Sequence, residues 1–218
     1  MSSLRLAILL LASSLTALAP AAFPQAPQSR DAALAGLKST DTRTRAEAVV
    51  WMANRGSMAD VPLLQERLRD ESSLVREFAE QGLWLLWSRS GDAALDALMA
   101  RGAEAMQAGQ HAAAIALFSQ VIQKKPDFAE GWNKRATVYY LAGEYRRSIA
   151  DCDEVLKRNP GHFGALSGLG EIHLGLGEPE QALAWFRKAL EANPNLLGVE
   201  FRIKEIERKL QEKRGRST

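Results

Sequence analysis

Apolar residues between Leu95 and Leu196 recur every three or four positions, in segments that are each about as long as a short helix. Glycine or proline stands between neighbouring segments. The closing prolines and the turn glycines recur at one constant interval, here called the long period: Pro126, Pro160 and Pro194, and Gly109, Gly143 and Gly177. Glycine suits a helix end where φ is positive, and proline prevents a helix from continuing. The pattern therefore predicts three successive helix pairs with one common geometry.

Other positions repeat at the long period. Small residues and bulkier ones alternate in fixed registers: Gly102, Ala136 and Gly170; Ala114, Ser148 and Ala182; Phe118, Cys152 and Phe186. Small residues let the two helices of a pair approach closely, and large ones fill the space between pairs. One helix pair cannot bury its apolar face alone, so units of this kind stack into a solenoid.

This pattern resembles the tetratricopeptide repeat (TPR), a helix–turn–helix unit. The copy from Ala129 to His162 matches the motif at Trp132, Ala136, Tyr139, Gly143, Tyr145, Ser148, Val155 and Pro160. The third copy departs from it at His173 and the first copy at Leu98. The resemblance implies an all-α fold, a right-handed helical-repeat solenoid of stacked antiparallel helix pairs, with three TPR repeats in residues 92–196. It also implies that Trp132 fills the gap between the helices of the middle pair.

A second repeat, with a shorter interval that we call the short period, precedes the first. The stretch from Leu68 to Ala79 reads as a helix end, a polar turn and a new helix, and the stretch from Leu37 to Ala48 matches it. Residues 31–91 in this respect resemble HEAT repeats of the short bacterial kind. An unclassified pair of helical hairpins is the alternative.

The N-terminal segment has a different character. Arg5 is the only charged residue before Arg30, and a run of about 13 apolar and small residues, 6–18, is short for a membrane span. Small residues around Pro20 suit a cleavage site. We therefore interpret residues 1–21 as a secretory signal peptide, with a membrane anchor as the alternative, and residues 22–30 as a linker. The expected location is periplasmic or secreted.

The C-terminal residues 197–218 are strongly charged. Val199, Ile203, Ile206 and Leu210 form one apolar stripe at helical spacing, which predicts a helix that caps the last repeat. The basic tail beyond it is either a solvated, frayed end or a contact for an anionic surface.

Composition removes several classes of function. A net charge of +2 gives no argument for nucleic acid binding, and the single cysteine, Cys152, cannot form an internal disulfide. Because Cys152 takes the register of two phenylalanines, we expect a buried, inert thiol. The glycines around Gly170 already have repeat roles, and the histidines lack metal-ligand spacing. We therefore expect no catalytic residues, no metal and no cofactor.

The inner surface of the solenoid is the expected working surface, because the first helix of each TPR pair lines the concave face. By register, the residues expected to bind a peptide there are Asn133, Lys134, Thr137, Tyr140 and Glu171. The amide, ammonium and phenol groups suit a peptide backbone, a carboxylate and a stacked side chain. An ordinary solvated inner face is the alternative for each residue. Some TPR proteins bind chaperone C-terminal carboxylates through a Lys/Asn/Arg set, and the corresponding first and third copies here lack that set.

Two functions follow from these expectations. The first is an exported, non-catalytic scaffold that binds a protein or peptide in the TPR groove, with no membrane span left after signal removal. The second is a substrate-recognition or accessory subunit of a cell-envelope enzyme, whose partner supplies the chemistry. A third hypothesis is that the chain is itself an enzyme, but the sequence contains no set of residues typical of a catalytic site.

Overall fold

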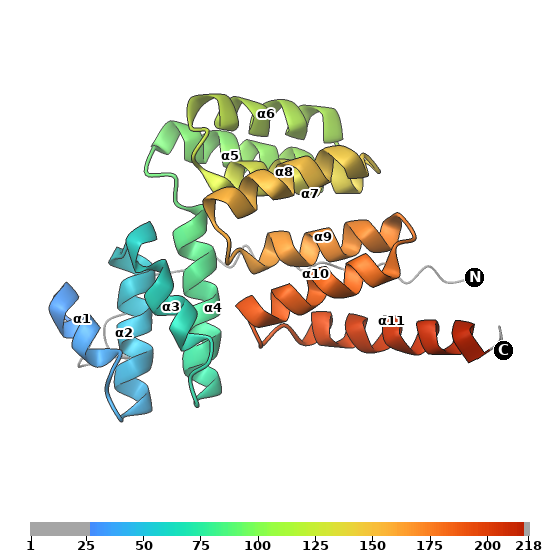
Figure 1. Cartoon of the computed structure of the whole chain (residues 1–218). Coiled ribbons are helices and arrows are strands. Elements are labelled where there is room, and N and C mark those ends of the chain that lie inside the picture. Colours follow the sequence, from blue (N-terminus) through green and yellow to red (C-terminus); the bar gives the residue numbers. More distant parts are fainter. Residues whose placement is uncertain (1–26, 216–218) are drawn as a thin grey trace.

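The computed structural model describes residues 27–215, and every regular element within that range is helical (Figure 1). Its α-helices are α1 (Arg30–Gly36), α2 (Thr42–Arg55), α3 (Val61–Arg67), α4 (Ser73–Ser88), α5 (Ala93–Gln107), α6 (His111–Lys124), α7 (Ala129–Leu141), α8 (Tyr145–Arg158), α9 (Phe163–Gly175), α10 (Pro179–Ala192) and α11 (Leu197–Gly215). A 3₁₀ turn, Met58–Asp60, precedes α3. The predicted all-α fold of stacked helix pairs is confirmed. The predicted signal peptide lies outside the described residues.

Helices α5 to α10 form three antiparallel pairs, each closed by a glycine. Gly109, Gly143 and Gly177 have φ values of 70°, 75° and 76°, a left-handed conformation that favours glycine. The amide after each glycine donates to a carbonyl five residues back, for example Glu144 N to Tyr139 O at 2.8 Å. This bond satisfies a carbonyl that the helix end would leave free. The long period therefore repeats one turn geometry.

Size complementarity holds each pair together. A Cβ atom on Gly102 would lie 2.6 Å from Cε1 of Phe118, and one on Gly170 would collide with Phe186. Both phenylalanines are fully buried. The middle pair replaces this glycine–phenylalanine combination by Ala136 and Cys152, both buried in one cluster. A larger residue on α7 is tolerated there because the residue facing it on α8 is smaller.

Helices α1 to α4, here called the N-terminal block, form two hairpins that repeat at the short period. Arg45 Nη1 donates to the carbonyls of Ser39 and Thr40, and Arg76 Nη1 donates to those of Asp70 and Glu71. Each arginine thus binds the two carbonyls that lie six and five residues before it. The sequence repeat therefore corresponds to a repeated structural contact. The likeness to HEAT repeats stays a prediction.

The N-terminal block does not extend the TPR stack end to end. In Figure 1, α1 to α4 lie crosswise to α5 to α11, and α4 lies beside the ends of the repeats. Its arginine Arg76 donates to Asn195 Oδ1 in the turn before α11, at 2.9 Å. Asn193, two residues earlier, donates to Glu80 of α4 at 2.9 Å. The block is therefore fixed against the turn between α10 and α11.

Helix α11 covers the open end of the last pair, as the sequence predicts. Its stripe of Val199, Ile203, Ile206 and Leu210 packs on a cluster that includes Phe186 of α10. Between residues 27 and 215, none of the helices combines the length and apolar character that crossing a membrane requires.

The prediction for Trp132 is wrong in one respect. Its side chain is only partly buried, and the guanidinium groups of Arg135 and Arg158 lie over the ring, 5.1 Å and 4.9 Å from its centroid. Arg135 itself is held by a bidentate pair with Asp151 of α8. The tryptophan therefore contributes cation–π contacts near the surface in place of a buried core contact.

Candidate functional site

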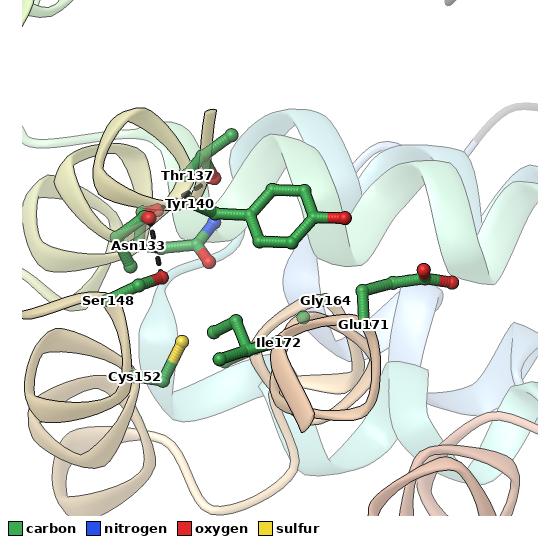
Figure 2. Close-up of a pocket in the computed structure, with 11 residues that line it drawn as sticks. Asn133, Thr137, Tyr140, Ser148, Cys152, Gly164, Glu171 and Ile172 are labelled. Carbon is green, nitrogen blue, oxygen red and sulfur yellow. Dashed lines mark hydrogen bonds between the residues drawn. The ribbon is translucent and has the colours of Figure 1, made fainter. Parts of the chain in front are cut away.

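A crevice of about 130 Å³ separates the second and third TPR pairs. Helices α7, α8 and α9 line it with eleven residues: Asn133, Ala136, Thr137, Tyr140, Ser148, Cys152, Gly164, Ala165, Gly168, Glu171 and Ile172. Figure 2 shows Cys152 and Ile172 on one side of the space, with Tyr140 and Glu171 extending towards the same opening. The crevice therefore combines small and apolar walls with a polar rim.

The crevice exists because the middle repeat lacks a phenylalanine. Phe118, one repeat earlier, packs in a cluster with Val138 of the following pair. Cys152 occupies the same register and packs near Ile172, which lies one long period beyond Val138. A thiol fills much less space than a phenyl ring, and so room remains between α7, α8 and α9.

One glycine on α9 leaves room at the same place. Gly168 lines the crevice, and a Cβ atom built on it would meet no atom within 4 Å. Glycine in a helix interior lowers stability relative to alanine, so helix propensity does not explain a glycine at this position. A side chain at 168 would therefore enter unoccupied space at the crevice.

The wall at Asn133 contains a polar group with a free acceptor. Asn133 is 8% exposed, and its Nδ2 donates to Oε2 of Glu130 at 3.1 Å. Because a carboxylate only accepts, the amide nitrogen must face Glu130 and the amide oxygen must face away from it. Within residues 27–215, no hydrogen bond reaches that Oδ1 atom, and Figure 2 shows the amide end of Asn133 towards the crevice.

Glu130 is the buried centre of this wall. Its Oε2 atom also lies 3.2 Å from Nε2 of His162, and its Oε1 atom lies 3.2 Å from Nζ of Lys134. Burial alone would raise the pKa of Glu130, but the hydrogen bond from His162 and the charge of Lys134 together bring it below its usual value. Glu130 is therefore an anion that links α7 to the turn before α9.

The tautomer of His162 follows from its second contact. The Ala165 amide donates to Nδ1 of His162 at 3.1 Å, so Nδ1 carries no proton. The ring proton is on Nε2 and points to Glu130. His162 thus also caps the first turn of α9, where amides would otherwise lack partners.

The N-terminal block supports this side of the crevice. Trp87 of α4 is 3% exposed and stacks on His162 with ring centroids 4.3 Å apart. Trp84 meets Phe163 edge to face, with centroids 5.2 Å apart. The two tryptophans, which have no aromatic counterpart in the first hairpin, pack against the start of α9.

The rim at Tyr140 and Glu171 is electrically neutral. Arg202 of α11 binds both oxygens of Glu171, at 3.0 Å and 3.2 Å. Burial, and then the charge of Glu171, raise the pKa of Tyr140 above its usual value. The phenol is therefore protonated near neutral pH and can donate a hydrogen bond.

Cys152 has no sign of reactivity. Burial, reinforced by Asp151 and Asp153, raises the pKa of its thiol to about 12. The thiol is thus protonated at neutral pH and contributes apolar surface to the crevice. No cluster of three or more His, Cys, Asp or Glu side chains able to hold a metal ion occurs between residues 27 and 215.

The structure brings four of the five predicted binding residues to this crevice: Asn133, Thr137, Tyr140 and Glu171. Lys134 does not line it and is paired with Glu130. Thr137 is exposed, with its hydroxyl donating to the Asn133 carbonyl at 3.0 Å. Sequence reasoning missed Gly168 and the crevice-opening role of Cys152. The signal was present, since cysteine replaces phenylalanine in one register of three.

Comparison with known proteins supports the repeat assignment. Residues 99–161 and residues 133–196 each match the tetratricopeptide repeat family. This part of the chain consists of TPR repeats. A TPR repeat-containing protein of Rhizobium etli is 33% identical over 79 residues, which are 36% of this chain and 37% of that protein. The chain thus spans little more than a third of this curated relative.

Solved structures agree on the fold. The TPR domain of Sgt2 from Aspergillus fumigatus superposes with a TM-score of 0.53 at 22% identity, over 56% of this chain and 83% of that one. The first TPR of Spaghetti (RPAP3), bound to the HSP90 peptide SRMEEVD, superposes with a TM-score of 0.51 at 20% identity, over 54% of this chain and 93% of that one. At these identities the likeness concerns the fold.

Proposed function

We propose that this chain is a non-catalytic interaction protein that binds an extended segment of a partner protein along the inner face of its TPR repeats. The observation that carries the proposal is the crevice between α7, α8 and α9, with the free Oδ1 atom of Asn133 in its wall. This acceptor is accessible to solvent within the crevice, and a bound peptide N–H group can take the place of water there. The RPAP3 domain provides a precedent for a peptide on this fold.

The geometry also favours a peptide over a small metabolite. Small and apolar groups make up most of the crevice lining, with Asn133 in the wall and Tyr140 and Glu171 at the rim. A ligand that only partly enters the molecule, with one side chain inserted and its backbone on the rim, fits this arrangement. Chemistry, where it is needed, would come from the partner.

Peptide selection with mapping by NMR tests this function. A library of random dodecapeptides, displayed on phage, is selected against the full chain, and binders are synthesised. In spectra of the methyl-labelled protein, binders are expected to shift the resonances of Ile172, Ala165 and Ala136, which line the crevice. Shifts confined to α11 or to α4 would place the binding surface elsewhere and contradict the proposal.

Export is a second part of the proposal and rests on the sequence alone. The short apolar run and the small residues around Pro20 support removal of a signal peptide of about 21 residues, and hence a periplasmic or secreted protein. N-terminal sequencing of the protein from its own cells is expected to begin near Ala22. An intact Met1 or Ser2 in a cytoplasmic fraction would contradict export without affecting the binding proposal.

A further inference from the structure

We propose that the crevice between α7, α8 and α9 accepts an uncharged apolar side chain, of about the size of leucine, and rejects a peptide's terminal carboxylate. The inference rests on the proposed peptide-binding function and names the chemistry of the residue that anchors the peptide. It distinguishes this groove from one that recognises an acidic chain end.

The volume and walls of the crevice fit such a group. Apolar cavities of about 150 Å³ in proteins admit benzene. The present crevice, at about 130 Å³, has Ala136, Cys152, Ala165 and Ile172 on its walls. An apolar side chain that enters the crevice would move from water into contact with apolar walls. This transfer is the main source of favourable free energy when apolar groups are buried.

The charged side chains of α7 and α9, the two helices that supply most of the crevice lining, already have partners. In α7, Glu130 is paired with Lys134 and Arg135 with Asp151. The carboxylate of α9, Glu171, is held by Arg202, and its histidine, His173, lies 2.6 Å from Glu178. Every charged side chain of α7 and α9 therefore has an opposite or complementary partner. A carboxylate entering the crevice would lose its hydration without meeting a free cation, which is costly.

The polar groups of the wall and the rim suit a peptide backbone instead. Asn133 Oδ1 is an acceptor for a backbone N–H, and the protonated phenol of Tyr140 is a donor for a carbonyl. An extended chain presents both groups on either side of each residue. These contacts orient the backbone while the crevice takes the side chain.

The test uses dodecapeptides that are acetylated, amidated and fluorescein-labelled, random except for one position that is fixed and moved along the peptide. The fixed residue is leucine, aspartate or lysine, and a fourth set has a free C-terminal carboxylate. Fluorescence polarisation with the full chain is expected to show the leucine sets binding about tenfold or more tightly than the others, since burial of one leucine supports a difference of that order. Tighter binding of the aspartate, lysine or free-carboxylate set would overturn the inference.

Two variants separate this inference from the function on which it rests. Ala136→Gly combined with Cys152→Phe recreates the glycine–phenylalanine combination of the flanking repeats, and Gly168→Leu fills the crevice from α9. Circular dichroism and urea unfolding show which of the two variants is folded, and peptide binding is measured on that variant. Loss of leucine-set binding in the folded variant supports both proposals. If the variants weaken binding but the free-carboxylate or aspartate set binds most tightly, only the inference is overturned. If every peptide set binds both variants as tightly as it binds the native protein, the proposed function is overturned as well.

Discussion

The indole of Trp84 lies so close to Gly164 that a Cβ atom at position 164 would stand 2.5 Å from Cη2 of the tryptophan. Trp84 belongs to the N-terminal block, whereas Gly164 lines the crevice of the TPR repeats. The two parts of the chain thus share a wall. Contacts made by α4 therefore affect the shape of the crevice, although α4 lies outside the groove.

Gly164→Ala is expected to destabilise the fold by about 1–3 kcal/mol, because the new methyl group must displace Trp84. Gly168→Ala, one helical turn away, is the matched control. Its Cβ meets no atom within 4 Å, so alanine should raise stability by about 0.5–1 kcal/mol through helix propensity. Urea unfolding measures both values. Equal changes in the free energy of unfolding for the two variants would show that Trp84 does not pack against Gly164.

Arg45 offers a test of the N-terminal block. Its side chain is 6% exposed and binds Asp70, Glu71 and two turn carbonyls. Arg45→Lys is expected to cost about 2–4 kcal/mol, because one ammonium cannot replace the fork of donors in a buried site. Arg55→Lys, at the exposed end of α2, should change stability by less than about 0.5 kcal/mol. Similar losses in both variants would contradict the buried role of Arg45.

The buried carboxylate of Glu130 predicts that the stability of the fold depends on pH. Since its pKa is lower in the folded protein than in the unfolded chain, its contribution is fully present above the unfolded pKa and is lost as pH falls through the folded value. Glu130→Gln should therefore cost about 2 kcal/mol at pH 7, and the difference from the native protein should shrink below about pH 4. Urea unfolding between pH 7 and pH 3 measures it.

The control for this prediction is Glu178→Gln. Glu178 also contacts a histidine, His173, but its side chain is 41% exposed. Its substitution should have little effect at any pH, because exposed pairs contribute little. A Glu130→Gln difference that persists unchanged at pH 3 would show that the carboxylate charge is not what stabilises this site.

Much of the fold could be predicted from periodicity, but the docking of its two parts could not. The long period predicts the TPR pairs, and the short period predicts the hairpins in which Arg45 and Arg76 act alike. The bond from Arg76 to Asn195 joins residues 119 apart in the chain and belongs to neither period. Periodicity reports contacts between neighbouring repeats, and therefore says nothing about a block that packs across them.

The candidate site could be predicted in part. Helical register places Tyr140 and Glu171 on the inner face, because it depends only on spacing. It does not reveal that the amide of Asn133 is turned to a buried Glu130, or that Lys134 is paired with the same carboxylate. Those partners depend on His162 and on the packing of Trp87 from the N-terminal block.

The most direct test of the central claim is the affinity of one selected dodecapeptide for Gly168→Leu, measured by calorimetry beside Gly198→Leu. Both glycines are helical, and a Cβ at either meets no atom within 4 Å, but Gly198 lies in α11, away from the crevice. Binding through the crevice predicts that Gly168→Leu stays folded and loses affinity about tenfold or more, with Gly198→Leu unchanged. Equal affinity of the two variants and the native protein would contradict it.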